Sequence, residues 1–136
     1  MDYFEKAKKA AKKYTVLDLI PELLDAATKV HILHLSVTGP GSYAQHIALN
    51  ELYDALPDLV DAVAESWQGV TGEIPKYKPN QAPTLNSVSD CIDYLEQIHQ
   101  KITNAQKTIK YSEIVNDLDN IKSQLNKTKY KLKFLT

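Results

Sequence analysis

Two histidines flank a Gly-Pro-Gly turn in the first half of the chain, and regularly spaced carboxylates follow them. His34 and His46 each lie six residues from Pro40, in the segment VHILHLSVTGPGSYAQHIALNELYDALPDLVDAVAESW (30–67). If two antiparallel helices meet at this turn, residues equidistant from the turn lie at the same height along the two helices, and the two imidazoles can therefore come into contact. Imidazoles and carboxylates together are typical metal ligands, so the segment is a candidate metal site.

Helical spacing gathers six polar residues on one side of the second helix. Successive residues of an α-helix are rotated by about 100°, which places the six within a sector of about 120°. They are His46, Asn50, Asp54, Asp58, Asp61 and Glu65. The like charges of Asp61 and Glu65 repel each other unless a cation, such as a metal ion, lies between them. The ordinary alternatives are a solvated acidic face and two polar histidines at a helix interface.

The distance between the histidines and the carboxylates restricts how they could share a metal ion. His46 and Asp61 are fifteen residues apart. That separation is roughly 22 Å along an α-helix. A shared site therefore requires a second copy of the chain, related by a two-fold axis, and would occur twice in each dimer.

Apolar residues recur at helical spacing in four stretches, and no stretch alternates with the period of a strand. The predicted helices cover residues 15–38, 43–68 and 88–109, with Thr15 and Asp18 as a capping box and Ser42 as a cap. After a break near Tyr111, the apolar series of a fourth helix runs from Ile114 to Leu135. Pro21 either bends the first helix or lies in its first turn, Pro57 bends the second, and Gly69 ends it.

The arrangement of these helices predicts an all-α fold. Residues 69–83 are rich in Gly and Pro and form the one long connection. Two antiparallel hairpins joined by one long crossover make a four-helix bundle of the ferritin-like type. We assign residues 15–136 to this bundle and residues 1–14 to a basic N-terminal extension.

Composition indicates a single soluble domain. The chain has 136 residues, of which 43% are hydrophobic and 24% charged, with a net charge of −1. Cys91 is the only cysteine, and no leader or membrane-spanning run is visible, so we expect a cytoplasmic protein that does not contact membranes. All 16 basic residues are lysines. Any contact with nucleic acid would therefore be made to phosphates, without bidentate arginine readout of bases.

The same segment resembles Dps, the DNA-binding protein from starved cells, a cage-forming branch of the ferritin-like superfamily. The family pattern is His-x11-His-x3-Asp-x10-Asp-x3-Glu, and this chain has His34, His46, Asn50, Asp61 and Glu65 at those positions. The stretches LHLSVTGPGSYAQH and ELYDALPDLVDAVAES also resemble the family, and the likeness covers residues 30–69. It implies that the histidines of one subunit and the carboxylates of its partner bind iron together.

Three features depart from the Dps pattern. Asn50 stands where the family has an aspartate ligand, which removes one negative charge from the site. Leu35 replaces the tryptophan that usually follows the first histidine. The long connection is too short for the small extra helix that Dps proteins place at the dimer interface.

The resemblance implies a protein that binds Fe(II) between subunits of a homo-oligomer, at least a dimer and at most a dodecameric cage. The implied activity is that of a ferroxidase, with peroxide or oxygen as oxidant. It also implies non-specific DNA binding by a basic tail, here Lys6, Lys8, Lys9, Lys12 and Lys13. The alternative is a ferritin-like bundle without catalysis, acting as a structural or nucleic-acid-associated assembly protein.

Two further histidines are weaker candidates for metal ligands. His31, one turn before His34, is either an auxiliary ligand or a partly buried, hydrogen-bonded side chain. Glu96 and His99 form a single Glu-x-x-His unit, whereas bundles that bind two irons within one chain use two such units, so a surface pair is expected.

Overall fold

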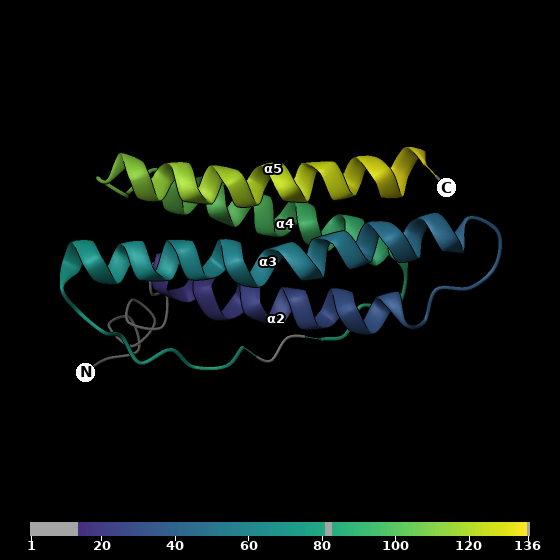
Figure 1. The fold of residues 1–136 in the computed structure, drawn as a ribbon, viewed down its shortest axis with the longest axis horizontal. Helices are drawn as coiled ribbons and strands as arrows, with labels where there is room; N and C mark the ends of the chain where they lie inside the picture. The colour runs from purple at the N-terminus through teal and green to yellow at the C-terminus, as the bar shows by residue number, and fades with distance from the viewer. Residues whose placement is uncertain (1–13, 81–82, 136) are drawn as a thin grey trace, which may run out of the picture.

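The fold is a bundle of four α-helices. The computed structural model describes residues 14–80 and 83–135, and no strand occurs in these ranges. The helices are α2 (Val16–His34), α3 (Ser42–Thr71), α4 (Val88–Gln106) and α5 (Ser112–Phe134). Figure 1 shows two antiparallel pairs, α2 with α3 and α4 with α5, and a long connection that returns along the bundle beside α2. The predicted all-α fold with two hairpins and one long crossover is confirmed.

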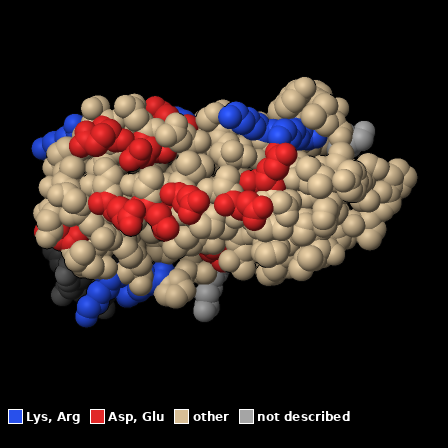
Figure 2. Space-filling model, viewed as in Figure 1, with Lys and Arg blue, Asp and Glu red and all other residues tan. Residues whose placement is uncertain are grey.

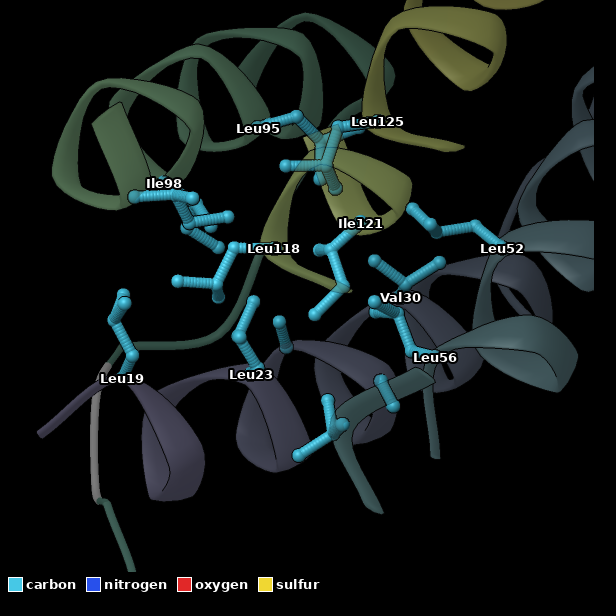
Figure 3. Close-up of a cluster of buried hydrophobic side chains, with 14 of the residues drawn as sticks. Leu19, Leu23, Val30, Leu52, Leu56, Leu95, Ile98, Leu118, Ile121 and Leu125 are labelled. Atoms are coloured by element: carbon cyan, nitrogen blue, oxygen red, sulfur yellow. The ribbon is translucent and has the colours of Figure 1, made fainter. Parts of the chain in front are cut away.

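The core lies where the four helices meet. Both α3 and α4 pack against α2 and α5, so each helix has two neighbours. Figure 3 shows leucine, isoleucine and valine side chains from all four helices pointing toward one another. The fully buried side chains include Leu19, Leu56, Ile98 and Ile121, and Cys91 is also in the core, as predicted. This packing holds α2 and α3 side by side and thereby positions the histidine pair.

The start of α2 is as predicted, but its end is not. The Asp18 carboxylate accepts a hydrogen bond from the Thr15 N–H at 2.8 Å, which is one half of the capping box. Pro21 lies inside the helix. The helix ends at His34 instead of residue 38, because the Leu35 N–H bonds to the Ile32 and Leu33 carbonyls and the chain then turns toward Gly39 at φ 88°.

Both ends of α3 differ from the prediction. Gly41 caps the N-terminus at φ 81°, and Ser42 is already the first helical residue. The helix continues through Gly69 to Thr71 and ends at Gly72, where φ is 70°. A glycine inside a helix costs only about 1 kcal/mol, whereas a left-handed residue cannot continue the helix, so Gly72 ends it.

One smaller prediction also needs correction. Helix α4 ends at Gln106 instead of residue 109, because the N–H groups of residues 107–109 bond to carbonyls three residues back and tighten the last turn. Leu24 belongs to the apolar pattern of residues 15–38, but it is 42% exposed beside the crossover. Among the described helices, none combines the length and the hydrophobicity that a membrane span would need.

Candidate metal centre

The two histidines of the predicted site meet in the structure. His34 is the last residue of α2, and His46 lies in the second turn of α3. Their Nε2 atoms are 3.0 Å apart, and the rings stack with centroids separated by 3.7 Å. The prediction that the turn brings the imidazoles together is therefore confirmed.

A backbone contact fixes the orientation of His46. Its Nδ1–H donates a hydrogen bond of 3.2 Å to the carbonyl oxygen of His34. Carbonyls in the last turn of a helix have no partner within the helix, so this bond also satisfies the end of α2. With its proton on Nδ1, neutral His46 has its Nε2 lone pair on the side facing His34, where it accepts a hydrogen bond from the His34 Nε2–H.

The spacing of the two Nε2 atoms suits adjacent ligands of one metal ion. Two nitrogens at right angles, each about 2.1 Å from a metal ion, would be separated by about 3.0 Å, and the observed separation is 3.0 Å. Within residues 14–80 and 83–135, no group of three or more His, Cys, Asp or Glu side chains could hold a metal ion. In the part of the chain that the structure describes, one copy thus brings two imidazole donors together without a third nearby ligand of these types.

The predicted carboxylate ligands lie elsewhere on α3. Asp61 and Glu65 are exposed and are fifteen and nineteen residues beyond His46. Figure 2 shows a row of acidic side chains over α3, while the end of the bundle that holds the α2–α3 turn shows none on this face. The structure therefore separates the histidines from the carboxylates. The predicted DNA-binding lysines, Lys6, Lys8, Lys9, Lys12 and Lys13, lie outside the described residues.

Tyr53 is a member of the site that the sequence interpretation did not identify. Its ring stacks on His31 with centroids 3.9 Å apart and meets the edge of His34 at 5.1 Å. Its hydroxyl donates to Oδ1 of Asn50, and the Asn50 amide donates to Asp54 at 2.9 Å. Its position in the sequence could have identified it, because a residue three after Asn50 and seven after His46 lies on the side of α3 that faces α2.

The same contacts settle the surroundings of the weaker candidates. His31 is exposed and stacked, which differs from the partly buried, hydrogen-bonded side chain offered as one alternative. Glu96 is exposed and pairs with Lys133 at 3.3 Å, as expected for a surface group. Asn50 uses both ends of its amide within α3.

Burial controls the protonation of His34. The side chain is 7% exposed, and burial, followed by the neighbouring His46 and His31, lowers the pKa of His34 below its ordinary value of 6.5. Its Nδ1 has no hydrogen-bond partner among the described residues. His34 is therefore held neutral, which is the form that binds metal ions.

This lowered pKa predicts that the metal-free protein loses stability as the pH falls below about 6.5, because the unfolded chain then binds a proton that folded His34 resists. The loss continues until the pH passes below the folded-state pKa. Thermal unfolding in chelator between pH 7.5 and 5.5 should show the decline, and His34→Gln should flatten it. His99, whose pKa is also lowered by burial and nearby lysines, makes a second contribution, so His99→Gln is the matched variant. Equal pH profiles for wild type and His34→Gln would contradict this assignment.

Comparison with known proteins supplies a family. A family of unknown function (DUF5856) matches residues 34–132, a range that begins at His34 and covers α3, α4 and all but the last two residues of α5. The chain belongs to this family. This DUF5856 member is also 27% identical over 129 residues to an uncharacterized 14.6 kDa protein from the mobD-ri intergenic region of enterobacteria phage T4, a match that covers 95% of this chain and 94% of the phage protein. No solved structure matches it.

Proposed function

We propose that the protein is a Dps-like, ferritin-like bundle that binds Fe(II) between two copies of the chain and oxidises it with peroxide or oxygen. The observation that carries the proposal is the 3.0 Å separation of the His34 and His46 Nε2 atoms, held by two helices and a backbone hydrogen bond. The antiparallel order of the helices and the long crossover in Figure 1 agree with a ferritin-like arrangement.

In this proposal each copy contributes different ligands to a shared site. His34 and His46 bind from one chain, and Asp61 and Glu65 bind from the other, because α3 alone cannot bring them together. Fe(II) is the substrate and each ion gives one electron. Two ions and two protons reduce one hydrogen peroxide to two waters, and four ions and four protons reduce one oxygen to two waters, so the chain supplies ligands and charge without a nucleophile. The carboxylates favour the more highly charged oxidised ion, and the buried neutral imidazole of His34 excludes water on one side.

Asn50 has a different role from the aspartate of the Dps pattern. Its Oδ1 accepts from Tyr53 and its amide donates to Asp54, so both ends of the amide already have partners within α3. We infer that the site works with two imidazoles and two carboxylates, one ligand fewer than Dps. The lost negative charge weakens the affinity for the oxidised ion and thus favours its release.

Anaerobic calorimetry with Fe(II), followed by addition of peroxide, tests this function. The proposal predicts saturable binding of about one Fe(II) per chain, since a two-fold dimer holds two equivalent sites. Peroxide should then convert the bound ion to Fe(III), seen by absorbance. Absence of saturable binding, or oxidation no faster than that of free Fe(II), would contradict the proposal.

A second candidate is a ferritin-like bundle without catalysis that acts as a structural or nucleic-acid-associated assembly protein. The committed hydrogen bonds of Asn50 favour it, since they remove a ligand. Metal analysis of protein purified without chelator separates the two candidates. An inter-subunit site should retain iron or zinc, whereas a bundle without a working site should retain neither.

The lysines of the N-terminal extension lead to a prediction on DNA. We expect weak, sequence-independent binding to duplex DNA that falls steeply between about 50 and 200 mM salt, because lysine contacts to phosphates release counterions. Many tails in a large oligomer would have to act together against the acidic body of the protein. Gel shifts should show that a variant lacking residues 1–13 no longer binds. Unchanged binding by that variant would contradict the role of the tail.

A further inference from the structure

The outward surface of α3 has an N-terminal part, in which the only acid, Glu51, is paired with Lys131, and an acidic part beyond it. Tyr43 and Ile47, near its N-terminus, are 79% and 41% exposed. Four exposed acids follow on the same stripe, and none forms an ion pair within the described part of the chain. They are Asp54, Asp58, Asp61 and Glu65. Figure 2 shows this division as a row of acids over one part of α3 only.

The proposed shared site determines how two such helices would face each other. If Asp61 and Glu65 of one copy reach His46 of the other, the two α3 helices run antiparallel about a two-fold axis. The two-fold axis must then pass midway between residue 46 and residues 61–65. Because every residue of an α-helix adds the same rise, this midpoint lies at about residues 54–55 of α3. Asp54 of both copies then lies beside the axis, while the N-terminal part of each helix, with His46 at its edge, faces the acidic part of the other.

We propose that occupancy of the shared metal site controls assembly, so that two copies associate when a divalent cation is bound and separate when it is removed. This inference rests on the proposed function. Without a cation, association brings eight carboxylates onto one surface, and their like charges repel. A cation in each site neutralises Asp61 and Glu65 and adds bonds that only a pair of chains can make.

The hydrogen bond from Asn50 to Asp54 has a clear role in this arrangement. The neutral amide donates to the carboxylate that lies nearest the axis, at 2.9 Å. An aspartate at position 50 would instead add two more negative charges to the dimer surface. Asn50 therefore keeps the repulsion small enough for two cations to overcome, which accounts for an amide at a position where Dps has a ligand.

Sedimentation velocity of the full chain, in EDTA and in Zn²⁺ as a redox-inert probe, tests this inference. We expect monomers in EDTA and dimers or larger assemblies in Zn²⁺, with at least a tenfold change in the dissociation constant, equivalent to about 1.4 kcal/mol. His34→Ala/His46→Ala should stay monomeric in Zn²⁺. High salt in EDTA should also favour association, because about 1 M salt shortens the screening length to about 3 Å.

Variants that remove negative charge near the two-fold axis provide a second test of this inference. Asp54→Asn/Asp58→Asn leaves all four proposed ligands in place and should allow dimers to form in EDTA. Asp93→Asn/Glu113→Gln, which removes two exposed acids of α4 and α5, should behave like wild type. Asn50→Asp should make the need for Zn²⁺ stronger.

The possible outcomes separate this inference from the proposed function. If the wild-type protein binds Zn²⁺ as a dimer and remains a dimer in EDTA, metal binding does not control assembly. The proposal of a metal site shared between copies is unaffected by that result. Zn²⁺ bound by a protein that stays monomeric overturns both, and so does the absence of Zn²⁺ binding by calorimetry. The inference is supported if, in EDTA, the Asp54→Asn/Asp58→Asn variant forms dimers while wild type and Asp93→Asn/Glu113→Gln remain monomers.

Discussion

Replacing His34 and His46 together by alanine should lower the affinity for Fe(II) by more than about 100-fold, because even the loss of groups that only orient a metal ligand costs 10–100-fold. The fold of one copy brings the two Nε2 atoms to 3.0 Å from each other at the proposed site. Anaerobic calorimetry measures the affinity, and the fast phase of oxidation after peroxide addition should disappear with it.

The matched control for this prediction is His99→Ala. His99 is a half-buried histidine on α4 and belongs to no proposed metal site. Circular dichroism should show that both variants remain helical, since His34 and His46 lie at the edge of the core. If the double variant and wild type bind Fe(II) equally, the histidine pair is a structural contact and the enzymatic proposal fails.

Leu56→Ala should destabilise the fold by about 2–5 kcal/mol, because it leaves a cavity where the helices meet. Leu56 is fully buried on α3, and Figure 3 shows it among core side chains of the neighbouring helices. Urea unfolding followed by circular dichroism measures the change in the free energy of unfolding.

Leu24→Ala makes the same substitution at a site that is 42% exposed, and it should cost less than about 1 kcal/mol. Similar losses for Leu24→Ala and Leu56→Ala would mean that the core does not lie where the four helices meet. The comparison also tests the surface position of Leu24.

Helical periodicity was sufficient to predict the helices, because each packs one apolar stripe against two neighbours. Along α5 the predicted residues Ile114, Leu118, Ile121 and Leu125 are all fully buried. Periodicity could not decide where helices end. Gly69 and Gly72 are the same residue type, and only the backbone conformation, with φ at 70° for Gly72, shows which one ends α3.

The candidate site was predicted in part. Equal distances from Pro40 were enough to bring His34 and His46 together, since a short turn aligns antiparallel helices residue by residue. The role of Tyr53 was missed because it depends on side-chain directions across α2 and α3, which spacing along one helix does not give. The commitment of Asn50 to Tyr53 and Asp54 was missed for the same reason.

Mixing two inactive variants tests the central claim, a metal site shared between copies, most directly. His34→Ala/His46→Ala keeps the carboxylates, Asp61→Asn/Glu65→Gln keeps the histidines, and neither should bind Fe(II) tightly alone. In an equal mixture only a dimer of one of each has an intact site, one of its two, so binding should recover to about a quarter of the wild-type capacity if the chains pair at random and to about half if the bound ion drives pairing. No recovery on mixing, or tight binding by the carboxylate variant alone, would contradict it.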